Sequence, residues 1–219
     1  MISSAEVADR FGALRERLSR AGGDKVKVVA VTKGFGPDSV AAAIGAGLAD
    51  VGENYAQELL SKSNSLSAQP GIDLQPRWHF IGRLQRNKIR KIASLVHIWQ
   101  SVDRPELASE IARRAPSATV LVQVDIAGKD GRGGCPPSEI TRLVQHCRDA
   151  GLEVAGLMAV GPPGPPELAR PGFRLLSTQA ADLGLPELSM GMSADIEVAV
   201  EEGATMVRVG TALFGARPR

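Results

Sequence analysis

The sequence predicts a single (β/α)₈ barrel with an extra N-terminal helix, in which residues 1–219 form one domain. Short segments of β-branched residues alternate with amphipathic helical segments along almost the whole chain. Eight such strands fit into 219 residues, and no shift in composition or long internal repeat divides them. A doubly wound open sheet is the alternative, because hydrophobic periodicity cannot show whether a sheet closes into a barrel.

The first two elements are the most clearly marked. Residues 3–20 carry apolar side chains on one helical stripe, and Ser3 and Glu6 have the spacing of a capping box. Residues 26–34 then form a run of β-branched residues between a Gly-Gly-Asp turn and Gly34. A continuous apolar run is typical of a parallel strand that is covered on both faces. This strand ends at Lys33, where α/β folds place their ligands.

The remaining elements follow in the same rhythm. Further strands are expected at residues 49–52, 78–82, 97–102, 118–124, 153–158, 187–190 and 204–208. Helices are expected to begin at residues 37, 53, 85, 103, 138, 173 and 194. The second of these helices should fade into a polar loop at residues 61–70. A glycine-rich loop is expected at residues 128–137, and a proline-rich loop at residues 161–166 cannot enter a sheet.

The composition argues against several classes of protein. A net charge of +2 is too small to indicate a nucleic-acid partner, and two cysteines cannot build a disulfide framework. No apolar run approaches the roughly 20 residues that span a bilayer, and the N-terminus does not have the pattern of a signal peptide. The three histidines lie far apart, without metal-ligand spacing. We therefore expect a cytoplasmic protein with no membrane, nucleic-acid or metal partner.

Two segments, one basic and one rich in glycine, could be taken for binding motifs. Residues 83–91 could form an RNA-binding face, but Leu84, Ile89 and Ile92 favour an ordinary amphipathic helix with a solvated basic side. Residues 128–134 are rich in glycine, yet they lack the Gly-Lys-Ser/Thr ending of a phosphate-binding P-loop.

The chemistry gathers at the predicted carboxyl ends of the strands. Lys33 alone could be a strand-end lysine that reaches into water. Ser193, as the expected N-cap of a helix, and Gly210-Thr211 after the last strand could be a cap and a turn. Barrels often bind phosphate between their last two βα loops, however. Together the three features predict a site for a phosphorylated aldehyde or ketone, held by a Schiff base to the amine.

Six motifs carry a resemblance to one family. They are residues 30–33 (AVTK), 51–55 (VGENY), 78–82 (WHFIG), 157–159 (LMA), 188–193 (LSMGMS) and 208–215 (RVGTALFG). In this order they resemble the successive motifs of the pyridoxal phosphate homeostasis proteins, the YggS/PROSC family. The resemblance runs from about residue 28 to residue 215. The segment between Met158 and Leu188 is shorter than the family pattern.

The resemblance implies a barrel similar to the N-terminal domain of alanine racemase, which binds pyridoxal 5′-phosphate (PLP). Lys33 matches the Schiff-base lysine, and Arg208 matches the arginine that faces the pyridine nitrogen. The positions that match the phosphate-binding residues are Ser193, Gly210 and Thr211. The positions that match residues lining the ring are Asn54, His79, Met158 and Met192.

The resemblance also implies a carrier or regulator of PLP supply without established catalytic activity. An arginine only donates hydrogen bonds, so it would keep the pyridine nitrogen unprotonated and weaken the ring as an electron sink. Alanine racemases add a β domain with a second acid–base group, and we expect none here. Apo-forms of PLP enzymes are the expected recipients, and the expected state is a monomer or a weak homodimer.

Two enzymatic readings remain as alternatives. A PLP-dependent racemase would use Lys33 and the same phosphate loops. A Schiff-base aldolase acting on a phosphosugar would also need acidic partners inside the barrel, for which Asp125 and Glu153 are the obvious carboxylates.

Overall fold

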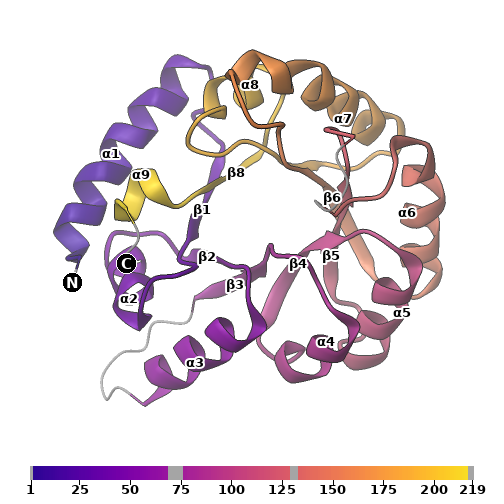
Figure 1. Ribbon diagram of the computed structural model, residues 1–219, viewed down its shortest axis with the longest axis horizontal. Helices are drawn as coiled ribbons and strands as arrows, with labels where there is room; N and C mark the ends of the chain where they lie inside the picture. The colour runs from indigo at the N-terminus through magenta and orange to yellow at the C-terminus, as the bar shows by residue number, and fades with distance from the viewer. Residues whose placement is uncertain (1, 69–75, 129–132, 217–219) are drawn as a thin grey trace.

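Eight parallel strands close into a barrel in the computed structural model, which describes residues 2–68, 76–128 and 133–216 (Figure 1). Each strand pairs with its sequence neighbours, and β1 also pairs with β8. That last pairing closes the sheet, so the predicted barrel is confirmed and the open doubly wound sheet is wrong. The strands are β1 (Lys27–Val31), β2 (Asp50–Glu53), β3 (Arg77–Phe80), β4 (Val96–Val102), β5 (Thr119–Val124), β6 (Glu153–Ala159), β7 (Glu187–Ser189) and β8 (Met206–Val209).

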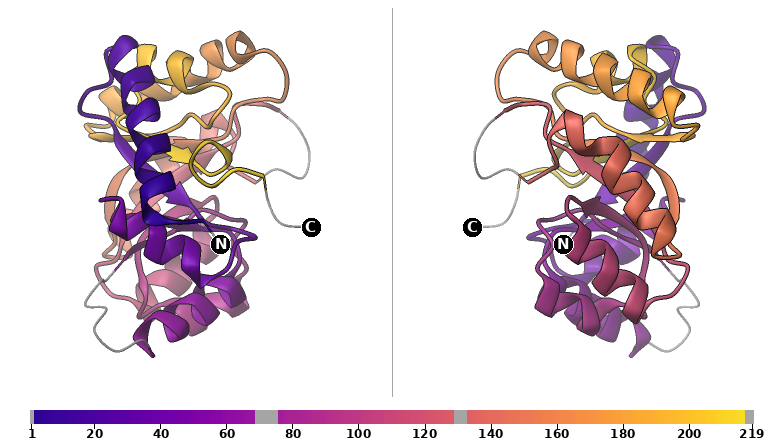
Figure 2. Two further views of the ribbon diagram at one scale, coloured as in Figure 1. Left: turned by 90° about the vertical axis from the view of Figure 1, so that its left-hand side faces the viewer. Right: turned by 90° about the vertical axis from the view of Figure 1, so that its right-hand side faces the viewer.

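Helices surround the ring of strands, as the end-on view and the two side views show (Figures 1 and 2). They are α1 (Ser4–Arg20), α2 (Pro37–Gly45), α3 (Ala56–Ser67), α4 (Arg86–Ile92), α5 (Pro105–Arg114), α6 (Ile140–Asp149), α7 (Arg170–Asp182), α8 (Ile196–Glu201) and α9 (Thr211–Phe214). Two short 3₁₀ helices, η1 (Pro137–Glu139) and η2 (Pro166–Ala169), precede α6 and α7. Within the described ranges, no helix has both the length and the apolar character required to cross a membrane.

The extra helix α1 begins with the expected capping box. The main-chain N–H of Glu6 donates to the hydroxyl of Ser3 at 3.2 Å, and the Glu6 carboxylate accepts from the main-chain N–H of Ser3 at 2.8 Å. These two bonds satisfy donors that have no partner inside the helix. Val7, Leu14 and Leu18 are buried on one stripe of the helix. The capping box and the apolar stripe together explain why this segment folds as predicted.

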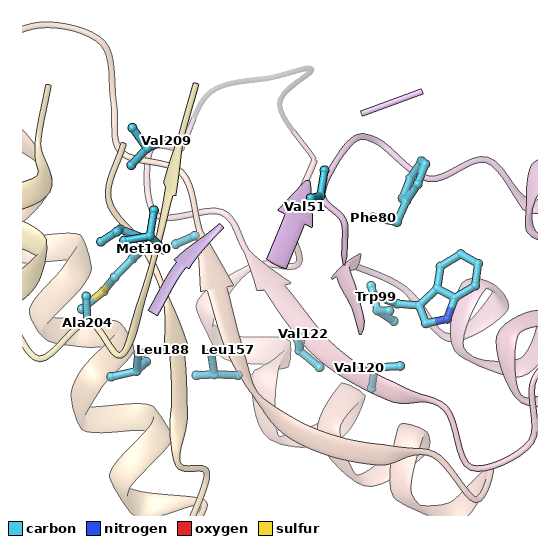
Figure 3. Packing of buried hydrophobic residues seen from close by; sticks show 14 of the residues in the cluster. Val51, Phe80, Trp99, Val120, Val122, Leu157, Leu188, Met190, Ala204 and Val209 are labelled. Atoms are coloured by element: carbon cyan, nitrogen blue, oxygen red, sulfur yellow. The ribbon is translucent and has the colours of Figure 1, made fainter. Parts of the chain in front are cut away.

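The main hydrophobic core is a shell between the sheet and the helices. Figure 3 shows part of it, with Val120, Val122 and Leu157 on the barrel strands. Val29, Leu121, Met158 and Met206 are also buried, but they do not belong to this shell. They alternate along their strands with shell residues, so they face the inside of the barrel. Burial on both faces explains the unbroken apolar runs that mark the strands in the sequence.

The barrel interior also contains polar side chains. His79, Gln100, Ser189 and Arg208 are all at least 96% buried on β3, β4, β7 and β8. A buried polar group is costly unless it is hydrogen-bonded, and these four are bonded to one another or to the strands. The barrel interior thus contains buried apolar side chains and one group of polar side chains that are joined by hydrogen bonds.

Several element boundaries differ from the sequence prediction by a few residues. Strand β1 ends at Val31, so the expectation that it ends at Lys33 is wrong. Helix α3 continues through most of the expected polar loop to Ser67, because Lys62 and Leu66 are buried on the face that they share with Leu59. The hydroxyls of Ser65 and Ser67 bond to carbonyl groups one turn earlier in the same helix. Helix α7 begins at Arg170 instead of residue 173, directly after η2. Helix α8 begins at Ile196 with Asp195 as its N-cap, so the expectation that Ser193 caps it is wrong. In the expected glycine-rich loop, residues 129–132 lie outside the described residues.

Candidate functional site

A cavity of about 510 Å³ lies at the carboxyl ends of the strands, around Lys33. Seven of the nine predicted site residues line it. They are Lys33, Asn54, Met192, Ser193, Arg208, Gly210 and Thr211. They come from the segments after β1, β2, β7 and β8 and from β8 itself, so closure of the barrel brings them together.

The half-buried Lys33 sits two residues beyond the end of β1, and its main-chain neighbours are held by helix α3. The ammonium of Lys62 donates to the main-chain oxygen of Thr32 at 2.7 Å. On the other side, the main-chain N–H of Gly34 donates to the Glu58 carboxylate at 2.8 Å. Because both flanking peptides are fixed, the position at which the Lys33 side chain enters the cavity is also fixed.

The Lys62 ammonium belongs to a buried ionic cluster. Its side chain is 3% exposed, and it lies 2.5 Å from Oε1 of Glu53, which is fully buried. The Thr32 hydroxyl donates to the same carboxylate oxygen at 2.5 Å. Burial raises the pKa of Glu53 above its ordinary value, against the opposing effect of the Lys62 charge. The cluster therefore holds a costly charge close to the Lys33 turn.

Arg208 forms part of the inner wall of the cavity. Its Nη1 donates to the main-chain oxygen of Ser189 at 2.7 Å and to the Ser189 hydroxyl at 2.8 Å. Its Nη2 donates to the main-chain oxygen of Ala159 at 2.7 Å. Burial lowers the pKa of Arg208 to about 10, so the guanidinium still carries its charge at neutral pH. Among the described residues, no carboxylate lies within ion-pair distance of it.

The loop between β7 and α8 forms one side of the cavity. Asp195 accepts a hydrogen bond from the main-chain N–H of Met192 at 2.6 Å and so turns the chain back on itself. The main-chain oxygen of Ser193 accepts from Arg17 of helix α1 at 3.3 Å. Met192 remains 39% exposed at the mouth. These two hydrogen bonds hold the loop in place, and the side chains of Ser193 and Met192 border the opening of the cavity.

The loop after β8 lies close to the strand that leads to Lys33. A Cβ atom on Gly210 would lie 3.1 Å from the main-chain oxygen of Val31, closer than side chains normally approach. Glycine at this position lets the loop and the end of β1 pack against each other. Thr211, the next residue, begins α9 and adds a hydroxyl to the same wall.

Two predicted ring-lining residues lie elsewhere. His79 is fully buried in the barrel interior, where its Nε2 lies 2.8 Å from Asp50 and its Nδ1 lies 2.7 Å from the Gln100 amide. Burial lowers the pKa of His79, so the imidazole is neutral. Met158 is 1% exposed on β6 and also faces the interior. Neither residue lines the cavity.

The cavity also contains residues that sequence reasoning missed. Gln123 lines it from β5, and its polar side chain near the end of a valine-rich strand was the available signal. Gly82 lines it after β3, and a Cβ there would lie 2.0 Å from the main-chain oxygen of Asn54. No sequence pattern shows such an approach between two loops. Within the described ranges, no group of three or more potential metal-ligating side chains is present.

Comparison with known proteins places this geometry in a family. The profile of the alanine racemase N-terminal domain matches residues 2–218. The pyridoxal phosphate homeostasis protein of Pseudomonas aeruginosa is 41% identical over 223 residues, which cover 97% of this chain and 94% of the relative. The protein of the same name from Aquifex aeolicus is 39% identical over 225 residues, with coverage of 97% and 96%.

A solved structure shows the same fold at similar identity. PipY of Synechococcus elongatus, solved with PLP bound, superposes with a TM-score of 0.83 at 34% identity, covering 95% of this chain and 100% of PipY. The alanine racemase of Clostridium difficile superposes with a TM-score of 0.72 at 14% identity, which shows a shared barrel fold alone. The two homeostasis proteins and PipY are matched over nearly their full length, and the chain therefore belongs to the family of pyridoxal phosphate homeostasis proteins.

Proposed function

We propose that this protein binds PLP covalently through the Nζ atom of Lys33 and releases it again, as a carrier without catalytic turnover. One observation carries the proposal: a lysine amine and a buried, charged arginine line the same cavity. An amine attacks the aldehyde of PLP, and a guanidinium offers donors to the pyridine nitrogen. PipY, solved with PLP bound, supports the choice of ligand.

The polar groups of the wall suit the other parts of PLP. The Oδ1 atom of Asn54 is buried and has no hydrogen-bond partner in the described part of the chain, so a ligand hydroxyl would satisfy it. Ser193, Gly210 and Thr211 border the same cavity and provide two hydroxyls and closely approaching backbone. Such groups suit the oxygens of a phosphate. When PLP is bound, it supplies an aldehyde for amines and an electron sink whose strength depends on its ring nitrogen.

The described lining of the cavity contains few side chains that could transfer a proton to or from a bound amino acid. Racemisation requires one group that removes the α-proton and a second that returns it on the opposite face. Among the described residues lining the cavity, the titratable side chains are Lys33, Arg83 and Arg208. Tyr55 is 58% exposed and does not line the cavity. Arg208 would also hold the ring nitrogen unprotonated, which favours storage over turnover.

The aldolase alternative receives less support from the same wall. Its chemistry needs a carboxylate beside the lysine, and the described cavity lining contains none. Asp125, one of the two candidate carboxylates, instead bonds to the main-chain N–H groups of Ala127 and Gly128. The other, Glu153, accepts a hydrogen bond from Thr119 at the opposite end of β5.

The proposal includes a cellular location and a recipient for the PLP. The names of the relatives support a role in PLP homeostasis. We further propose that the protein works in the cytoplasm and passes PLP to apo-forms of PLP enzymes. A carrier must release its cargo, and Schiff-base attachment is reversible in water.

Borohydride reduction of the PLP-loaded protein, followed by peptide mapping, tests the site. The pyridoxyl group should be found on Lys33 and should be absent from Lys62, a buried lysine whose ammonium bonds to the residue before Lys33. A label on another lysine, or loaded protein without a label, would overturn the proposal.

Incubation of the loaded protein with L-alanine in deuterated water tests the absence of turnover. We expect no exchange at the α-carbon above a Lys33→Ala control, and transfer of PLP to an apo-enzyme in a parallel sample. Rapid exchange that depends on Lys33 would favour the racemase alternative.

A further inference from the structure

A chain of hydrogen bonds crosses the barrel interior from Asp50 to Arg208. Asp50 Oδ1 lies 2.8 Å from His79 Nε2, and His79 Nδ1 lies 2.7 Å from the Gln100 amide nitrogen. The Ser189 hydroxyl donates to the Gln100 amide oxygen at 2.6 Å. Arg208 Nη1 donates to the same hydroxyl at 2.8 Å. Five strands, β2, β3, β4, β7 and β8, therefore contribute to one connected chain.

The direction of each bond is fixed by its neighbours. A carboxylate only accepts, so the proton of the neutral imidazole sits on Nε2, toward Asp50. Nδ1 is then an acceptor and selects the NH₂ end of the Gln100 amide. The amide oxygen consequently faces Ser189 and takes its proton, which leaves the hydroxyl oxygen as an acceptor for Arg208. Reversal of any one bond would place two donors or two acceptors against each other.

The chain also connects two charges. Arg208 is 4% exposed, and the described residues that bond it are neutral oxygens of Ser189 and Ala159. At the far end, Asp50 accepts from Arg77 at 3.0 Å and is 21% exposed. Burial alone would raise the pKa of Asp50, yet the hydrogen bond from His79 and the nearby positive charges lower it overall. The charge of Asp195 acts on Arg208 directly. Aligned hydrogen bonds in a low dielectric polarise one another, so the chain gives Asp50 a second, indirect route to the same guanidinium.

We propose that His79 is a positioning residue for Arg208, acting through Gln100 and Ser189. His79 does not line the cavity, so it orients the guanidinium without contact with a ligand. The Nδ1 lone pair fixes the orientation of the Gln100 amide. The amide oxygen fixes the direction of the Ser189 hydroxyl, and the hydroxyl oxygen fixes the position of Arg208 Nη1. The effect on bound PLP rests on the proposed function, whereas the effect on Arg208 does not.

The first test uses the protein without PLP. His79→Leu removes the nitrogen acceptor and leaves the Gln100 amide nitrogen with only the weakly accepting sulfur of Met206 at 3.1 Å. His79→Asn retains an acceptor oxygen near the position of Nδ1. Nitrogen-15 NMR should show the Nε2-protonated tautomer in the unsubstituted protein. Hydrogen exchange of the Arg208 guanidinium should be roughly tenfold faster in the leucine variant and close to the original rate in the asparagine variant.

A matched variant separates positioning from loss of stability. Val120→Ala removes volume from the fully buried outer shell on β5, a strand that contributes no residue to the chain of hydrogen bonds. It should lower the melting temperature while leaving exchange at Arg208 unchanged. Equal exchange rates in His79→Leu and the unsubstituted protein, or equal acceleration in Val120→Ala and His79→Leu, would overturn the proposal.

The second test uses PLP-loaded protein. His79→Leu and Ser189→Ala should both shift the visible absorption band and release PLP several-fold faster, and His79→Asn should restore the original band. An unchanged band in yellow His79→Leu protein would overturn the positioning role while leaving PLP binding intact. Failure of the unsubstituted protein to bind PLP would instead overturn the proposed function, and the NMR result on Arg208 would still decide the positioning role.

Discussion

The ammonium of Lys62 lies 2.7 Å from the main-chain oxygen of Thr32, the residue immediately before Lys33. Glu58, one turn earlier on α3, accepts from the N–H of Gly34, the residue immediately after it. One face of one helix thus holds both peptides that flank the candidate nucleophile. The two bonds are accepted and donated by main-chain atoms of Thr32 and Gly34, so the helix residues that make them can be substituted without substituting Lys33.

Lys62→Met should weaken both the fold and the site. It leaves the fully buried Glu53 without its charge partner, and removal of one member of a buried pair costs roughly 3–5 kcal/mol of unfolding free energy. Urea denaturation measures this loss, and PLP titration of the folded variant should show weaker binding. The matched control is Lys91→Met on α4, an exposed lysine whose replacement should change the unfolding free energy by less than about 0.5 kcal/mol. A Lys62→Met protein as stable as this control would contradict the prediction.

Ser193→Ala should weaken the retention of PLP by roughly 1.5–3 kcal/mol, because it removes a hydroxyl donor from a charged phosphate. Pyridoxal, which lacks the phosphate, should bind almost equally to both proteins. Equilibrium dialysis with the two ligands gives the comparison, with Ser67→Ala at the exposed end of α3 as the control. Equal losses for PLP and pyridoxal would mean that Ser193 shapes the loop and does not hold phosphate.

The stability of the protein should depend on Glu110 in acid. Hydrogen bonds from Arg113 and Arg114 lower the pKa of Glu110 from an ordinary 4.5 to about 2. A depressed folded-state pKa gives stability that is present above pH 4.5 and is lost as the pH falls toward 2. The difference in unfolding free energy between the original protein and Glu110→Gln should therefore become smaller as the pH falls from 4.5 toward 2. A constant difference across the window would show that the ion pairs contribute no pH-dependent stability.

Both thiols should be inert in the folded protein. Cys135 and Cys147 are 3% and 0% exposed, and burial raises the pKa of each thiol to about 12. Only the thiolate reacts with a disulfide reagent, so at pH 8 the reaction should proceed no faster than the chain opens. In denaturant, two thiols per chain should react at once. Rapid modification of either cysteine under native conditions would show that its surroundings open locally.

Much of the fold could be predicted because each strand is buried on both faces. The apolar runs of β1 and β5 therefore stand out from the amphipathic helices around them. Closure could not be predicted this way, since the pairing of Ala30 with Val209 joins the two ends of the sequence. Local periodicity contains no information about such a contact.

The candidate site, like the fold, could be predicted from the sequence only in part. Lys33 was singled out because it ends an apolar run and Arg208 because it matches a family motif, and both line the cavity. His79 alternates with Trp78 and Phe80 of the outer shell, so an interior position could have been read from the sequence, but its depth below the cavity depends on strand register. Lys62 was overlooked as a residue of a polar helix, although its spacing from Leu59 and Leu66 places it on the buried face.

The pairing of β1 with β8 has a consequence for synthesis on the ribosome. Lys33 leaves the exit tunnel early, whereas Arg208 and the loop containing Gly210 and Thr211 emerge among the last residues of the described barrel. A nascent chain that has not yet released β8 displays the lysine without the wall that encloses it. Such a long-range contact also forms late, because the entropy of closing the intervening loop must be overcome first. Capture of the vitamin B6 aldehyde would then mark a polypeptide whose last barrel strand has been translated and has paired with the first.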